Sequence, residues 1–329
     1  MRSKKNPTLK SSKIRVGLSI GDPAGIGPAI TLAALNKLRG KADFTVIGDA
    51  SVLAQAAEIQ KISSPSFKLI DLKNVPQKNF CFGKVGRENG RAALEYLDAA
   101  LGLWEEDKID CLVTCPISKE AVNLSAGKFS GHTEYLAQKT GCPDPVMMLL
   151  NDKIKFSLLT RHIPLSAVSS ALRGENLESN ILNTLKGLKE LFSIKDPRLV
   201  FCGVNPHASD NSGAGKEEQE IILPLIKRMN IITGVAIGPL LPADTAIAQA
   251  YQGKYDCVIA AYHDQALIAL KLTGFDRGAN LTLGLPFVRT SPLHGVAFDL
   301  AAQPALARPG SLIAAINLAI KCTLNRKKA

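Results

Sequence analysis

The chain lacks several features by which common protein classes are recognised. No apolar run reaches the roughly 20 residues that a membrane-spanning helix requires, although 46% of the 329 residues are hydrophobic. The charged N-terminus is not followed by the apolar segment of a secretory signal. The seven cysteines are odd in number, and none forms a CxxC pair. We therefore expect a soluble, reduced, cytoplasmic protein without a membrane partner.

Two glycine-rich nucleotide signatures are also missing. The sequence has no GxxxxGK[ST] phosphate loop, and the glycines of GDPAGIGP (residues 21–28) do not follow the GxGxxG spacing. This segment joins a predicted strand to a predicted helix, where a glycine-rich turn can still let a ligand approach the backbone. A purely structural turn explains the segment equally well.

The net charge of +11 is confined to the two ends of the chain. Residues 1–15 and 318–329 together carry ten Lys or Arg and no acid, which leaves 30 basic against 29 acidic residues elsewhere. Basic ends of this kind are typical of solvated, disordered tails. A nucleic-acid partner is therefore not expected.

Strand-like and helical segments alternate along the chain. Such alternation predicts βαβ units, and so an α/β fold of α/β/α layers with largely parallel central sheets. We expect two lobes with a cleft between them. Predicted strands lie within 14–20, 44–49, 67–72, 109–117, 146–150, 154–160, 198–204, 231–238 and 256–261, and helices within 27–39, 50–59, 87–104 and 309–324, the last packing back on the first lobe.

Histidine is scarce, with five in the chain, and three of them directly follow predicted strands. Ligands of open α/β sheets bind beyond the carboxyl ends of the strands. Neutral imidazole is a common metal ligand, and a catalytic site needs three protein ligands and an open position. We predict that His162, His207 and His263 share one divalent metal, although any one of them taken singly is better explained as a polar loop residue satisfied by the backbone.

Other polar residues suit an anionic ligand. SGHTEYLA (130–137) has the pattern of a helix start capped by Ser130 or Thr133, which places His132 at the positive end of the helix. Arg289 is suited to bidentate capture of a phosphate or carboxylate, with a plain surface arginine as the alternative. The polar loop 205–220 has the length of a functional loop.

Taken in order, these motifs resemble a known family. GDPAGIGP, SGHTEYLA, RHIPL, NPHA, PADT, YDCVIAAYHDQ, TLGLP, RTSP and HGVAFD are similar to strings of the 4-hydroxythreonine-4-phosphate dehydrogenases, the PdxA family, from about residue 14 to 324. Membership implies an isocitrate/isopropylmalate dehydrogenase-like fold and a homodimer with active sites at the subunit interface. It also implies NAD, with NADP as the alternative, and one divalent ion (zinc, magnesium or cobalt) per site.

The resemblance assigns roles to residues of this chain. It gives the metal to His162, His207 and His263, the substrate to His132, Thr133, Lys271, Asn280 and Arg289, and the cofactor to His294 and Gly295. Asp244, Asp264 and Lys271 are the candidates for the group that takes the hydroxyl proton, and Asp264 could instead orient a ligating imidazole. The first lobe, on the cofactor side, comprises 1–130 together with 280–329, and 131–279 form the second, with the metal site and dimer interface.

The implied reaction is NAD-dependent oxidation of 4-phosphooxy-L-threonine at C3, followed by decarboxylation to 3-amino-2-oxopropyl phosphate in pyridoxal 5′-phosphate biosynthesis. The chain departs from the family pattern at Ala29, which replaces an acid, and in SPLHGV around His294, which weakens the cofactor assignment more than the metal assignment. Alternatives are a paralogue that oxidises threonate or erythronate 4-phosphate or a dihydrodiol, a histidine-zinc hydrolase, and a binding protein without activity.

Overall fold

The computed structural model describes residues 13–63, 65–174, 176–209 and 215–329. The predictions for the basic residues at 2, 4, 5 and 10 and for part of the polar loop 205–220 lie outside these residues. Among the described residues, no helix has the length and apolar character to cross a membrane.

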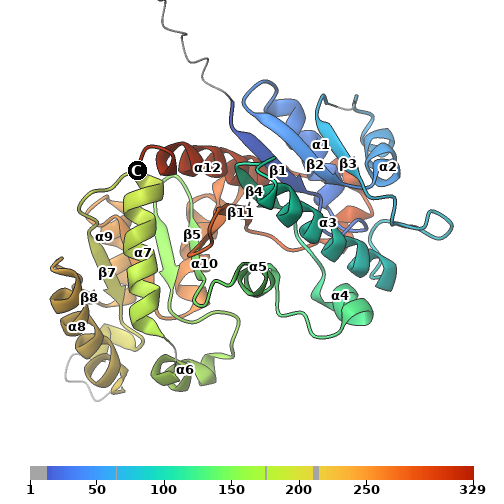
Figure 1. Cartoon of the computed structure of the whole chain (residues 1–329). Helices are drawn as coiled ribbons and strands as arrows, with labels where there is room; N and C mark the ends of the chain where they lie inside the picture. The colour runs from blue at the N-terminus through green and yellow to red at the C-terminus, as the bar shows by residue number, and fades with distance from the viewer. Residues whose placement is uncertain (1–12, 64, 175, 210–214) are drawn as a thin grey trace, which may run out of the picture.

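A single sheet of 11 strands runs through both halves of the molecule, in the order β3-β2-β1-β4-β11-β10-β5-β6-β9-β7-β8 (Figure 1). The mixed α/β class with a mostly parallel sheet is confirmed. The strands are β1 (Arg15–Ser19), β2 (Asp43–Gly48), β3 (Lys68–Asp71), β4 (Cys111–Thr114), β5 (Val146–Leu150), β6 (Lys155–Leu158), β7 (Leu199–Cys202), β8 (Leu240–Leu241), β9 (Cys257–Ala260), β10 (Ala279–Leu283) and β11 (Val288–Pro292).

The strand order separates two parallel blocks. Strands β3, β2, β1, β4 and β11 are parallel to one another, and β6, β9, β7 and β8 form the second parallel block. Antiparallel pairing of β11 with β10, β10 with β5, and β5 with β6 joins the blocks. Since β1–β4, β10 and β11 lie on one side and β5–β9 on the other, the order accommodates the predicted lobes, whose boundaries stay a prediction.

Helices cover the sheet and join the two halves. In Figure 1, α12 (red) lies between α7 and the strands around β1, and it contacts both. The helices are α1 (Gly27–Lys37), α2 (Ala50–Gln60), α3 (Arg87–Glu105), α4 (Lys119–Ala126), α5 (His132–Thr140), α6 (Val168–Gly174), α7 (Leu177–Phe192), α8 (Leu223–Thr233), α9 (Ala243–Tyr251), α10 (His263–Gly274), α11 (Phe298–Ala301) and α12 (Gly310–Arg326).

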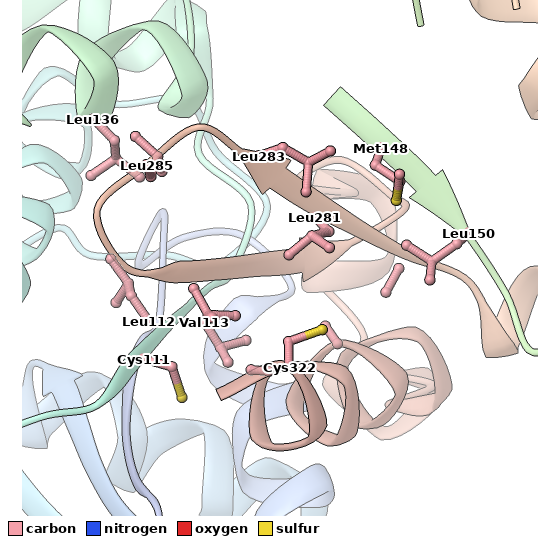
Figure 2. Close-up of a cluster of buried hydrophobic side chains, with 14 of the residues drawn as sticks. Cys111, Leu112, Val113, Leu136, Met148, Leu150, Leu281, Leu283, Leu285 and Cys322 are labelled. Atoms are coloured by element: carbon pink, nitrogen blue, oxygen red, sulfur yellow. The ribbon is translucent and has the colours of Figure 1, made fainter. Parts of the chain in front are cut away.

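One apolar core extends from one half of the sheet to the other. Figure 2 shows Met148 of β5, Leu281 of β10 and Cys322 of α12 in the same cluster as Leu112 of β4. Each fully buried side chain of this size contributes about 1.5–3 kcal/mol through removal of apolar surface from water. The antiparallel centre of the sheet, on which the site is built, is therefore fixed by packing from both halves.

Two predictions from the sequence are wrong. Residues 231–238 are not a strand: α8 continues to Thr233 and ends at Gly234, whose left-handed φ of 64° suits glycine, and β8 is only Leu240–Leu241. The basic C-terminus is not a free tail, because α12 continues to Arg326 and Lys327 forms an ion pair of 2.8 Å with Asp110.

Candidate functional site

A pocket of about 190 Å³, here called the central pocket, collects residues from four neighbouring strands and the loops that follow them. Thr114, Met147, Asn280 and Arg289 come from β4, β5, β10 and β11, which are adjacent in the sheet. The pocket brings together several predicted substrate, metal and cofactor residues. Its lining includes His132, Thr133, His162, Asn280, Arg289, His294 and Gly295, and also Pro116, Ile117, Lys119, Ser130, Gly131, Glu134, Ser291 and Pro292.

Arg289 is the strongest electrostatic feature of the central pocket. It is only 2% exposed, and its guanidinium donates hydrogen bonds to the Thr114 hydroxyl at 2.7 and 3.2 Å and to the Thr282 hydroxyl at 3.0 Å. Burial lowers the pKa of Arg289 to about 10, so that the side chain stays charged at neutral pH. Among the described residues it forms no ion pair. A buried cation without a carboxylate favours an anionic ligand.

Two more polar atoms of the pocket lack partners. The Nε2 atom of His132 and the Oδ1 atom of Asn280 are buried and make no hydrogen bond among the described residues. Burial lowers the pKa of His132 well below its usual value, and the charges of Arg289 and Lys119 lower it further, so this imidazole is neutral at pH 7. Buried polar atoms are normally satisfied, and these two can serve a bound polar molecule.

The helix start at His132 is open. Helix α5 begins at His132 as predicted, but its N-cap residue is Gly131, and no side chain caps it; the prediction of Ser130 or Thr133 as the cap is wrong. The first-turn N–H groups of a helix need acceptors, and their partial positive charge favours an anion. The open end of α5 therefore adds to the positive character of the pocket.

Two of the three proposed metal ligands meet at the sheet edge. The rings of His162 and His263 lie with their centroids 5.4 Å apart. Partial burial lowers the pKa of His162, and the neighbouring His263 and Lys119 lower it further, which favours the neutral imidazole that binds metals. His263 Nδ1 and Asp264 Oδ1 lie 2.7 Å apart. This bond leaves Nε2 of His263 for a ligand, as in many metal sites.

The third histidine is not in contact with this pair. His207 lies on an exposed turn beside residues outside the described part of the chain, and its φ of 57° is unusual for a residue with a side chain. His162 has a similar φ of 54°. Among the described residues, no group of three or more His, Cys, Asp or Glu side chains is arranged to hold a metal. Two imidazoles fit a metal here, and the place of His207 as a third ligand stays a proposal.

The three candidates for proton transfer lie away from the central pocket. Asp264 and Lys271 are exposed on α10, and Asp244 is exposed in the first turn of α9, where it accepts a hydrogen bond of 2.8 Å from the Thr245 N–H. None of the three is among the residues that line the central pocket. The structure therefore does not bring them to Arg289 within this chain.

A second pocket, here called the side pocket, adjoins the first. It measures about 520 Å³ and shares His294 with the central pocket. Ile26 and Ile30, which follow the GDPAG turn, form part of its apolar wall, and Ile26 N–H donates to the Val296 carbonyl at 2.8 Å. Its lining also includes Asp276, Ala297, Leu300, Leu306, Arg308 and Ser311.

Several residues of the two pockets are not predicted from the sequence. Thr114 lies within the predicted strand at 109–117 and Lys119 follows it, in TCPISK, and these polar residues at the end of the strand were the available signal. The apolar Ile26 and Ile30 are indistinguishable in sequence from ordinary core residues.

Comparison with known proteins identifies the family. Residues 40–319 match the family described as pyridoxal phosphate biosynthetic protein PdxA. A protein named 4-hydroxythreonine-4-phosphate dehydrogenase from Sulfurihydrogenibium is 39% identical over 325 residues, which cover 95% of this chain and 100% of that protein. One of the same name from Ruegeria is 40% identical over 312 residues, 92% of this chain and 95% of that one.

Comparison with solved structures leads to the same family. The crystal structure of 4-hydroxythreonine-4-phosphate dehydrogenase from Klebsiella pneumoniae aligns with a TM-score of 0.83 at 32% identity, covering 95% of this chain and 100% of that chain. A terephthalate 1,2-cis-dihydrodiol dehydrogenase from Burkholderia xenovorans aligns with a TM-score of 0.62 at 27% identity, covering 94% and 98%. The chain belongs to the PdxA family.

Proposed function

We propose that this protein is a 4-hydroxythreonine-4-phosphate dehydrogenase, which oxidises 4-phosphooxy-L-threonine at C3 with NAD and decarboxylates the product to 3-amino-2-oxopropyl phosphate. The observation that carries the proposal is Arg289, a buried cation without an ion pair among the described residues, in a pocket with unpartnered polar atoms. Such a pocket fits a small, polar, doubly anionic substrate. The proposed reaction places the enzyme in the cytoplasm, among its dissolved substrates.

In this proposal the chain binds and orients the substrate. The Arg289 fork holds one anionic group, and the hydroxyls of Thr114 and Thr282 keep its plane fixed. Asn280 Oδ1 accepts a hydrogen bond from the substrate ammonium or hydroxyl. Neutral His132 offers its Nε2 edge without adding a charge. Fixing both ends of the substrate positions C3 for hydride transfer.

The metal proposal assigns His162 and His263, with His207 as the third ligand, to one zinc, magnesium or cobalt ion. The paired rings and the Asp264 bond to His263 support it. A divalent ion supplies a Lewis acid at this place, which lowers the pKa of a hydroxyl and stabilises negative charge on oxygen. The protein's part is to keep the His162 imidazole neutral and to orient the His263 ring through Asp264.

For the cofactor we propose NAD, bound with its adenosine end in the side pocket and its nicotinamide end towards the central pocket. His294, which lines both pockets, and Gly295 lie where the two ends meet. The side pocket contains Asp276, an acid of the kind that binds the ribose 2′-hydroxyl of NAD, and also Arg308, which is suited to the 2′-phosphate of NADP. The choice of NAD therefore follows from the family resemblance. A higher kcat/KM with NADP than with NAD would overturn the choice of NAD but not the proposed reaction.

We also propose a homodimer with the active sites at the subunit interface. Ile268 and Leu272, 61% and 83% exposed, lie one helical turn apart on α10, and Asp264 lies one turn before Ile268 on the same side. Exposed apolar side chains gathered on one helix face mark an interaction surface. In the dimer this face brings Asp264 and Lys271 to the interface, where Asp264 orients His263 and Lys271 acts on the bound substrate.

The decisive experiment measures NADH formation from 4-phosphooxy-L-threonine with added divalent metal, and again after complete chelation. The proposal expects activity that depends on the metal. Absence of NADH with every metal tested would overturn the reaction, and full activity after chelation would overturn the metal's role. Erythronate 4-phosphate and the cis-dihydrodiol of terephthalate should be run in parallel, since the dihydrodiol dehydrogenase shares the fold. Both are anionic and fit Arg289, so preferred turnover of either one would favour the paralogue.

A further inference from the structure

Lys119 is a residue of the central pocket that has no role in the proposed function. It is the first residue of α4, where Ser118 caps the helix by accepting a hydrogen bond of 3.2 Å from the Ala121 N–H. This cap fixes the point at which Lys119 leaves the backbone. Lys119 lines the central pocket, as Arg289 does. The pocket therefore holds two cationic side chains of different kinds.

The ammonium group of Lys119 lies beside the open start of α5. A Cβ placed on Gly131 would lie 3.6 Å from Cε and 3.9 Å from Nζ of Lys119, and 3.0 Å from Oε2 of Glu134. The two helix starts differ: α4 has the Ser118 cap, whereas no side chain caps α5 at Gly131. Free first-turn N–H groups next to a lysine form the donor set by which proteins bind phosphate.

The cations Lys119 and Arg289 share this pocket with one acid, Glu134, whose carboxylate lies at the same helix start. Among the described residues, Lys119 has no acid within ion-pairing distance. Glu134, the acid of the α5 first turn, lines the same pocket but pairs with Arg161 at 3.6 Å. The buried Nε2 of His132 lacks a partner at the same helix start. The place therefore has a net excess of donors and positive charge.

We propose that Lys119, together with the N-terminus of α5, binds the phosphate group of the substrate, while Arg289 binds its carboxylate. The inference rests on the proposed function for the identity of the substrate, and it deepens that function by dividing the two anionic groups between two cations. A phosphate carries close to two charges near neutral pH. The partly solvated point charge of Lys119 suits that group, and the rigid, buried fork of Arg289 suits a planar carboxylate.

The test compares Lys119→Met and Lys119→Arg with Lys128→Met. Lys128 is a matched control, because it lies two residues after the end of α4, is exposed and does not line the pocket. We expect Lys119→Met to weaken binding of inorganic phosphate, measured by calorimetry, and to raise KM for 4-phosphooxy-L-threonine by about 10-fold or more. The KM for NAD should stay within about twofold. Lys119→Arg should recover most of the affinity, and Lys128→Met should match the wild type.

The possible results distinguish failure of the phosphate site from failure of the proposed function. Unchanged phosphate binding and unchanged substrate KM in Lys119→Met would overturn the inference. A raised substrate KM with unchanged phosphate binding would assign Lys119 to the carboxylate and overturn the division proposed here. If the wild type binds phosphate through Lys119 but does not oxidise 4-phosphooxy-L-threonine, the proposed function fails and the phosphate site stands. If the wild type neither binds phosphate nor oxidises this substrate, both are overturned. Equal thermal midpoints of the variants exclude loss of folding as the cause.

Discussion

The imidazole rings of His162 and His263 lie with their centroids 5.4 Å apart and their planes tilted by 49°, although the residues follow different strands, β6 and β9. Parallel pairing of these neighbouring strands brings their carboxyl ends to one edge. If the pair holds the metal with His207, each of His162→Ala, His207→Ala and His263→Ala should lose bound metal after dialysis, measured by elemental analysis. His294→Ala, outside this set, should keep it. Full occupancy in the His207→Ala variant would remove His207 from the site.

Asp264 should strengthen metal binding through its contact with His263. The 2.7 Å contact with Nδ1 orients the ring, so that its Nε2 atom is directed to the ligand. Asp264→Asn keeps the shape but removes the charge, and we expect metal affinity to fall by about 10- to 100-fold, measured by competition with a chelator. Asp264→Glu should retain more of the affinity. An unchanged affinity in Asp264→Asn would mean that the contact has no part in metal binding.

Arg289 should be needed for binding but not for folding. Because the guanidinium is buried without an ion pair among the described residues, replacement by the apolar Met removes an unfavourable desolvation. We expect Arg289→Met to unfold within a few degrees of the wild type, while KM for the substrate rises by about 100-fold. Thermal unfolding with and without the substrate gives a second measure, since a ligand that binds the native state raises its midpoint. Equal stabilisation of wild type and variant would contradict this role.

The sequence predicts the strands that are apolar throughout better than the strands that carry polar residues. The apolar runs at 154–160, 198–204 and 256–261 are strands β6, β7 and β9, because these strands are buried on both faces. Strands β10 and β11 were missed. They contain Asn280, Thr282, Arg289, Thr290 and Ser291, whose polar side chains interrupt the hydrophobic pattern.

The same polar residues explain why the site is built there. The Thr290 hydroxyl donates a hydrogen bond of 2.8 Å to the Ala315 carbonyl, and the Thr282 hydroxyl accepts a hydrogen bond from the Arg289 guanidinium. Strands that carry binding residues at the centre of a sheet therefore look least like strands in sequence. At residues 231–238 the sequence predicts a strand that the structure does not have. Ile231 and Ile232 are apolar, but they are 84% and 57% exposed in this chain. Exposure of this kind cannot be seen from hydrophobicity alone.

The α10 face predicts a defined dimer interface. Leu272 is 83% exposed on the helix that begins at His263. Leu272→Asp places a charge on this surface, so we expect the dimer to dissociate and activity to fall with it, measured by analytical ultracentrifugation and NADH formation. Ile231→Asp is the control, because Ile231 is 84% exposed at the end of α8. A dimer that survives Leu272→Asp, or dissociates with Ile231→Asp, would place the interface elsewhere.

Asp22 in the GDPAGIGP turn makes stability depend on pH. It is 0% exposed, its Oδ1 accepts from the Ala24 N–H at 2.9 Å, and Oδ2 makes no hydrogen bond among the described residues. Burial raises the pKa of Asp22 from 3.8 to about 6, although the N–H groups of Ala24, Ser118 and Gly25 oppose the shift. Between these values the unfolded chain has already lost this proton and the folded one keeps it. The free energy of unfolding therefore falls as pH rises through this window.

Asp22→Asn removes this dependence, since Asn does not titrate. At about 1.4 kcal/mol per pKa unit, the variant should gain about 3 kcal/mol relative to the wild type between pH 4 and pH 7, measured by urea unfolding. Asp110→Asn is a control of opposite sign. Although burial raises the pKa of Asp110, hydrogen bonds from Arg15 and Lys327 lower it overall, so its charge stabilises the fold above the unfolded pKa. Asp110→Asn should therefore destabilise more at pH 7 than in acid. A pH-independent difference for Asp22→Asn would mean that Asp22 is ionised throughout this range.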